Sequence, residues 1–68
     1  MSVYKVIEII GTSASSWEEA AGAAVAKARE TLRDLRVAEV VKQDVDVSDT
    51  GALTYRTKLS VSFKYEDN

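Results

Sequence analysis

The side chains available for chemistry in this 68-residue chain are carboxylates, hydroxyls and cationic groups, because it contains no histidine and no cysteine. That composition excludes a Cys/His zinc site, an iron–sulfur cluster, a disulfide scaffold and a nucleophile activated by imidazole. Glu18 and Glu19 are neighbours on an expected helix and point about 100° apart, so they do not face each other across a substrate. Ser13 lies in a turn that lacks the last glycine of a nucleophile elbow and the lysine of a phosphate loop. We therefore predict that the protein is not an enzyme.

The acidic run from Asp44 to Asp49 resembles the start of a calcium-binding loop. Its glycine comes two residues late, and Tyr55 stands where the closing glutamate belongs. On a strand, alternate residues lie about 7 Å apart along one face, too far for three of them to reach one ion at about 2.4 Å. One chain alone is not expected to close such a site, whereas a symmetry axis could bring the same acid from several copies to one point. The alternative is an acidic strand end that is simply solvated.

The first half of the chain predicts a strand followed by a helix. Residues 3–10 are rich in β-branched and aromatic side chains and run into a Gly-Thr-Ser turn, which indicates a strand. Ser15 with Glu18, or Ser16 with Glu19, has the spacing of a capping box. An apolar stripe at three- and four-residue steps then predicts a helix of about 18 residues that packs on a sheet. The stripe comprises Trp17, Ala20, Ala21, Ala24, Val25, Ala28, Thr31, Leu32 and Leu35, with Arg33 and Arg36 at the C-terminal end.

The second half predicts a hairpin. In residues 53–65 the odd positions are mostly apolar or aromatic and the even positions are cationic or hydroxylated, which indicates a strand with one dry face. Residues 37–47 predict another strand, and residues 49–51 (Asp-Thr-Gly) supply the turn between them. The apolar residues of the earlier strand change phase near Val40 and Val41. A β-bulge there, or burial of both faces in an assembly, explains the change equally well.

Residues 1–68 are thus predicted to form one α+β domain of order β-α-β-β, in which a three-stranded antiparallel sheet packs on one helix. One helix covers only one face of such a sheet, and so short a chain without disulfides usually needs self-association for stability. Nine Lys and Arg residues against eleven Asp and Glu give a pI near 5.0, which disfavours nucleic-acid binding. No apolar run approaches the roughly 20 residues that cross a bilayer. We expect a cytoplasmic protein that binds neither nucleic acid nor membrane.

Five stretches resemble the dodecin family in their order and spacing, and together they cover nearly the whole chain. They are VYKVIE at 3–8, the segment from Gly-Thr-Ser to Trp-Glu at 11–18, TLRDLR at 31–36, AEVV at 38–41 and VSFK at 61–64. The resemblance implies a hollow dodecamer of cubic symmetry built from β-α-β-β subunits. It also implies a small flavin-binding protein that serves binding, storage or protection without turnover.

The positions that contact flavin in such relatives carry other residues here. Flavin-binding dodecins resemble each other in a tryptophan just before the Glu-Val pair of the second strand, whose indole stacks on the isoalloxazine ring, and Val37 stands at that position. A glutamine of the third strand matches Arg56, and two arginines directed at the ligand match Asp44 and Lys64. Valine keeps the apolar burial but loses stacking worth about 1 kcal/mol or more. Flavin affinity is therefore expected to fall.

Two functions follow as hypotheses. The leading one is a dodecin-like homododecamer that binds, stores or buffers a small ligand, with FMN or riboflavin as the family ligand and the four positions above as its binding residues. The alternative is a flavin-free shell that is structural or binds a cation such as calcium. In that case Glu39, Asp44 and Asp46 would gather at symmetry axes as ligands.

Overall fold

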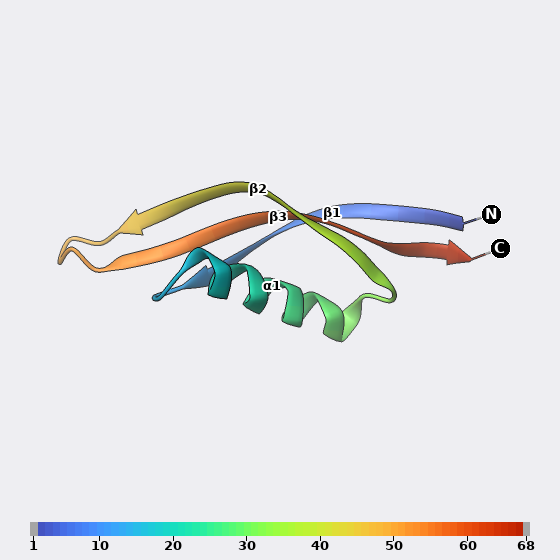
Figure 1. Cartoon of the computed structure of the whole chain (residues 1–68), viewed down its shortest axis with the longest axis horizontal. Coiled ribbons are helices and arrows are strands. Elements are labelled where there is room, and N and C mark those ends of the chain that lie inside the picture. Colours follow the sequence, from blue (N-terminus) through green and yellow to red (C-terminus); the bar gives the residue numbers. More distant parts are fainter. Residues whose placement is uncertain (1, 68) are drawn as a thin grey trace.

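The computed structural model describes residues 2–67, and the side chains of residues 2–65. The chain forms β1 (Ser2–Ser13), α1 (Trp17–Thr31), β2 (Leu35–Val47) and β3 (Leu53–Asp67), which confirms the predicted order (Figure 1). The three antiparallel strands lie in the order β1-β3-β2, so the C-terminal strand is central. The molecule is 52 Å long, whereas a helix of 15 residues extends about 22 Å. The helix therefore covers only part of one face of the sheet.

The core lies between α1 and the middle of β3. Ala20, Ala24 and Ala28 are buried on the helix, and Leu59 and Val61 are buried on the strand. These residues belong to the predicted alanine-rich stripe and to the predicted dry face, so both predictions are confirmed for the middle of the sheet. Small side chains on the helix let its axis approach the strands closely.

Gly11 marks the place where the helix comes closest to β1. A Cβ atom at Gly11 would overlap the carbonyl oxygen of Ala20 and would lie 2.9 Å from the Cβ of Ala24. Only glycine fits there without a shift of the helix. The sequence predicted a turn at residues 11–13, and this prediction is wrong. These residues continue β1 and pair with β3, with Gly11 opposite Thr57.

The helix starts at a serine cap. Ser16 Oγ accepts a hydrogen bond from the amide of Glu19 at 3.0 Å, as the second capping-box prediction requires. The carboxylate of Glu19 does not return to the cap but accepts a hydrogen bond from Ser13 Oγ at 2.7 Å. Ser13 Oγ in turn accepts from the amides of Ser15 and Ser16. The end of β1 and the start of α1 are thus joined through one buried hydroxyl.

The helix ends four residues earlier than predicted. It stops at Thr31, the amide of Leu32 still donates to the carbonyl of Ala28, and Asp34 takes a positive φ of 49°. Leu35 already belongs to β2, opposite Phe63 of β3. Sheet pairing overrides the helical spacing of this last stripe position, because β3 offers the backbone a partner there. The two arginines assigned to the helix end, Arg33 and Arg36, consequently lie outside it.

A β-bulge in β2 confirms one of the two explanations for its mixed pattern. The register shifts between Val40, which lies opposite Leu59, and Lys42, which lies opposite Lys58. From Val37 to Val40, odd-numbered residues of β2 point away from the helix, whereas after the bulge even-numbered residues do. The bulge therefore places Glu39 and Asp44 on the same face of the sheet, although their numbers differ in parity.

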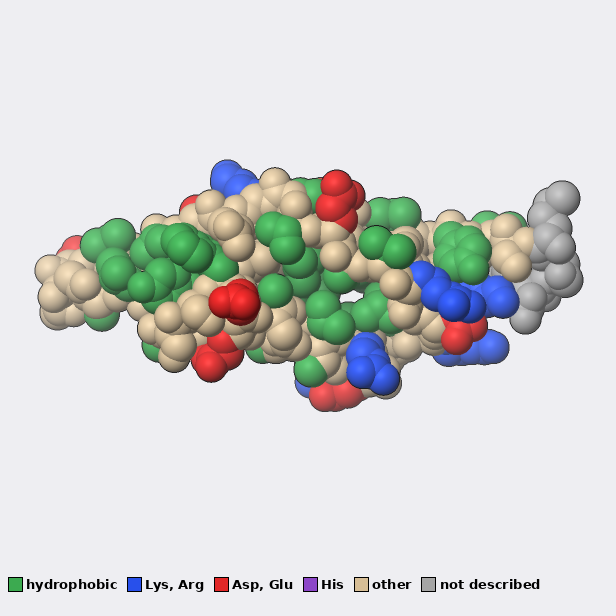
Figure 2. All heavy atoms as spheres, viewed as in Figure 1, with side chains coloured by type: hydrophobic (Ala, Val, Ile, Leu, Met, Phe, Trp, Pro, Cys, Tyr) green, Lys and Arg blue, Asp and Glu red, His purple; other side chains and the backbone are tan. Residues whose placement is uncertain are grey.

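The sheet face that points away from α1, here called the outer face, is not covered by the chain itself. Its apolar members Val6, Ile10 and Val37 are between 57% and 60% exposed. Hydrophobic side chains also reach the surface beyond the ends of α1 (Figure 2). Within the described residues, α1 is too short and too polar to be a membrane-spanning helix.

Candidate functional site

The candidate residues lie on the outer face, where the register aligns them in rows across the three strands. The rows, each given in the order β1, β3 and β2, are Val6, Ser62 and Val37; Glu8, Ser60 and Glu39; Ile10, Lys58 and Lys42; and Thr12, Arg56 and Asp44. Asp46 follows opposite Thr54. The face thus changes from apolar and hydroxylated near Val37 to strongly charged near Asp44.

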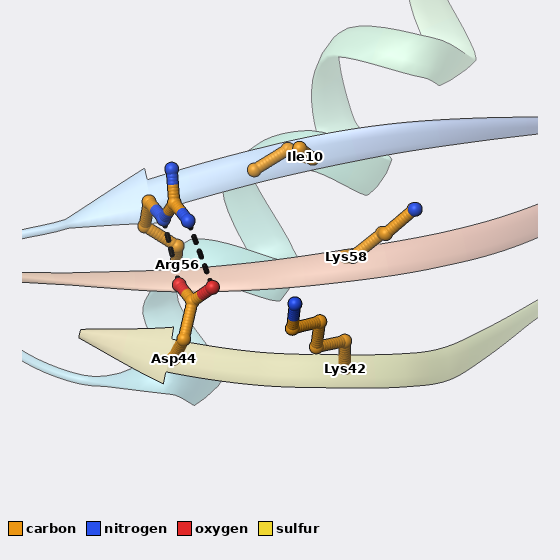
Figure 3. A pocket seen from close by; sticks show the side chains of 5 residues that line it. All are labelled: Ile10, Lys42, Asp44, Arg56 and Lys58. Atoms are coloured by element: carbon orange, nitrogen blue, oxygen red, sulfur yellow. Dashed lines mark hydrogen bonds and ion pairs between the residues drawn. The ribbon is translucent and has the colours of Figure 1, made fainter. Parts of the chain in front are cut away.

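Asp44 and Arg56 form a close polar contact on this face. Arg56 Nε donates to Asp44 Oδ1 at 2.6 Å and Nη2 donates to Oδ2 at 2.8 Å, so the ion pair is bidentate (Figure 3). The hydrogen bond from Arg56 lowers the pKa of Asp44 below its ordinary value, with the more distant positive charge of Lys42 acting in the same direction. The same contact raises the pKa of Arg56. Both groups are therefore charged at neutral pH.

Trp17 connects this ion pair to the helix from the opposite side of the sheet. Its indole Nε1 donates to the backbone carbonyl of Asp44 at 3.0 Å, and its ring packs edge-on against Tyr55 with the centroids 5.1 Å apart. Thr57 Oγ1 donates to the carbonyl of Trp17 at 3.0 Å. Sequence analysis missed this role, because the contact joins residues 27 positions apart and leaves no local pattern. Trp17 thereby holds β2 in place directly behind the ion pair.

The structure brings together only two of the four residues expected to bind flavin. Asp44 and Arg56 bind each other, whereas Val37 lies opposite Ser62 and Lys64 lies opposite Tyr4, towards the other end of the sheet. Arg56 and Lys64 lie eight positions apart on β3, which is about 27 Å on an extended strand. One small ligand on a single chain therefore does not contact both cations. These four assignments stay predictions.

The three acids expected to bind a cation all lie on the outer face of β2 but do not converge. The register separates Glu39 and Asp46 by six positions of β3, or about 20 Å. The carboxylate of Asp44 is occupied by Arg56. Among the described residues no three acidic side chains come close enough to hold one ion. A metal centre made from these acids therefore needs carboxylates from several copies, and the assignment stays a prediction.

Comparison with known proteins places the chain in a family. The dodecin family model matches residues 3–66. Calcium dodecin of Mycobacterium tuberculosis is 61% identical over 64 residues, which are 94% of this chain and 90% of that protein. Dodecin of Thermus thermophilus is 40% identical over 65 residues, which are 96% and 94% of the two chains.

Solved structures agree with this relationship. The M. tuberculosis protein, described as a calcium-chelating antigen with a novel calcium-binding site, superposes with a TM-score of 0.91 at 57% identity, over 98% of this chain and 96% of that one. The T. thermophilus structure superposes with a TM-score of 0.88 at 38% identity, over the whole of both chains. The family match and the common β-α-β-β fold agree, and we conclude that the chain belongs to the dodecin family of non-enzymatic ligand-binding proteins.

Proposed function

We propose that this chain is a calcium-binding dodecin, which assembles as a hollow homododecamer and holds calcium with carboxylates contributed by neighbouring copies. The observation that carries the proposal is the 61% identity, over 94% of the chain, to a calcium dodecin. This relationship favours the cation-binding alternative over the flavin hypothesis. Membership of the family implies self-association, and the exposed outer face gives a physical reason for it. The cytoplasmic location stays a prediction.

Glu39 and Asp46 are the acids we assign to the metal. Both are exposed on the outer face, and within residues 2–65 the carboxylate of neither takes part in a hydrogen bond or ion pair. Calcium takes six to eight oxygen ligands at about 2.3–2.6 Å. Three copies that meet at a threefold axis would supply six oxygens from a single carboxylate position. Asp44 would join only if calcium displaced Arg56.

Flavin has weaker support than calcium in this chain. Val37 offers no ring on which an isoalloxazine can stack, and it is 59% exposed in the single chain. Arg56, which matches a glutamine of flavin-binding relatives, already donates two hydrogen bonds to Asp44. A flavin would have to break that pair or bind beside it.

Isothermal titration of calcium into the chelator-treated, full-length protein tests the proposal. We expect saturable binding in the wild type. One of the two variants Glu39→Gln and Asp46→Asn should lose this binding, because one of these two positions supplies the ligands. Asp49→Asn is the matched control, since it removes the same charge from the turn after β2 and should leave binding intact. Calcium binding that is absent in the wild type, or equal in all four proteins, would contradict the proposal.

Riboflavin and FMN are titrated in parallel. Tight flavin binding without calcium binding would favour the flavin-binding hypothesis over the calcium proposal.

A further inference from the structure

An indole on the helix side of the sheet is bonded to the strand that carries the candidate acids. Trp17 Nε1 donates a hydrogen bond of 3.0 Å to the backbone carbonyl of Asp44, and Asp46 follows two residues later on the outer face. We propose that Trp17 is a positioning residue for calcium, because it holds the segment of β2 from which Asp46 projects, and that Asp46 is the ligand position. This inference rests on the proposed calcium function and decides between its two candidate acids.

The segment around Asp46 lies where the sheet is weakly supported. In the described sheet β2 is an edge strand, with β3 on one side. The hairpin that joins these two strands extends beyond the start of α1 (Figure 1). Exposed edge backbone opens locally at a low cost in free energy. A hydrogen bond from the helix to Asp44 therefore has a large effect on where the next residues lie.

Trp17 is itself held by the central strand. Its carbonyl accepts a hydrogen bond of 3.0 Å from Thr57 Oγ1, and Thr57 is fully buried. The indole ring packs edge-on against Tyr55, which lies opposite Val45 of β2. The indole thus links residues 44–46 to the start of α1 and to β3, which are firmly packed parts of the fold.

A backbone anchor controls an aspartate ligand more closely than a glutamate ligand. The side chain of Asp46 has one rotatable bond fewer than that of Glu39, so less rotamer freedom separates its carboxylate from the backbone. Calcium–oxygen distances span only about 2.3–2.6 Å, and metal ligands are commonly oriented by contacts behind them. Glu39 lies five residues before Asp44 and on the other side of the β-bulge. The hydrogen bond of Trp17 therefore supports Asp46 rather than Glu39.

An assembly multiplies the effect of this anchor. Where three copies meet at a threefold axis, a shift of β2 in each copy moves all the Asp46 carboxylates at once. Three indoles that hold the strands in advance lower the cost of ordering the ligands. The coupling is reciprocal, so calcium that binds better when the Trp17 hydrogen bond is intact also strengthens that bond by the same factor.

Calcium titration into chelator-treated, full-length Trp17→Phe tests the inference, because phenylalanine keeps an aromatic ring and lacks the indole N–H. We expect calcium to bind at least about five-fold more weakly than in the wild type, as the loss of one hydrogen bond predicts. Asp46→Asn should abolish binding and Glu39→Gln should retain it. Leu59→Val is the matched control, since it destabilises the buried core opposite Val40 and should leave calcium affinity unchanged.

Two further measurements separate positioning from a general loss of stability. Trp17 is the single tryptophan of the chain, so calcium should change the intrinsic fluorescence of the wild type and of Glu39→Gln but not that of Asp46→Asn. Without calcium, Trp17→Phe should speed amide hydrogen exchange at residues 44–47 more than at residues 37–40 of the same strand. The fluorescence test needs no change at Trp17, so it stands even if Trp17→Phe does not fold.

The outcomes distinguish this inference from the proposed function. Calcium binding that is as tight in Trp17→Phe as in the wild type, or that is lost in Glu39→Gln and retained in Asp46→Asn, overturns the role of Trp17 and leaves the calcium function intact. An equal loss of affinity in Leu59→Val and Trp17→Phe also overturns it. A wild type that binds no calcium overturns both.

Discussion

The carboxylate of Asp44 accepts two hydrogen bonds from Arg56 across neighbouring strands, at 2.6 Å from Nε and at 2.8 Å from Nη2. The two residues have opposite charges and lie directly opposite each other in the register, so the sheet itself aligns them. This pair occupies two positions that the family resemblance assigns to flavin, and one of the three that we considered for calcium. It thereby directs the metal proposal to Glu39 and Asp46.

Replacement of Arg56 by glutamine should change the dependence of stability on pH. Arg56 holds the pKa of Asp44 below its ordinary value of 3.8, so the pair stabilises the fold above pH 3.8, and this contribution is lost as the pH falls through the lowered pKa. We therefore expect Arg56→Gln to be less stable than the wild type at pH 7 and the difference to shrink below about pH 4. Thermal unfolding of both proteins between pH 2 and 7 measures it, with Arg29→Gln on the helix as a control. A difference that is constant over the whole range would show that the pair does not act through the charge of Asp44.

Replacement of Gly11 by alanine should destabilise the protein, because the added methyl group meets the backbone of Ala20. Overpacking of this kind costs about 1–3 kcal/mol. Gly22→Ala is the matched control, since the same change on the exposed side of α1 meets no atom within 4 Å and should stabilise the helix by about 0.5–1 kcal/mol. Denaturant unfolding of the two variants should give shifts of opposite sign. Equal shifts would mean that the helix does not approach β1 as closely as the structure shows.

Replacement of Val37 by tryptophan tests whether the outer face still accepts a flavin. An aromatic platform adds about 1 kcal/mol of stacking, so we expect the affinity for riboflavin to rise about five-fold or more, measured by the quenching of flavin fluorescence. Val47→Trp is the control, because Val47 is 64% exposed but lies opposite Leu53, on the face that carries the helix. A gain in neither variant, or the same gain in both, would mean that the flavin pocket has been lost through changes at other positions as well.

Much of the fold was predictable because its signals are local. The alternation along β3, the alanine-rich stripe of α1 and the Ser16 cap each depend on residues at most a few positions apart, and each is confirmed. The phase change at Val40 and Val41 allowed either a bulge or an assembly, and only strand pairing decided for the bulge. The C-terminal end of α1 was predicted incorrectly, since at Leu35 the helical spacing competes with a backbone partner on β3 that is distant in sequence.

The sequence by itself determined which residues alternate, which helix forms and which family the chain resembles, because these properties follow from short-range periodicity and from the order of motifs. Only the tertiary structure decided that Asp44 is paired with Arg56, that Lys42 lies opposite Lys58 and that Trp17 donates to the strand behind them. Each of these contacts joins two different elements. The β-bulge in β2 sets the register that pairs Asp44 with Arg56 and Lys42 with Lys58 on the outer face. A shift of one residue would have turned the charges of β2 to the other side of the sheet, so the chemistry of the outer face depends on strand pairing and is not written in any local segment.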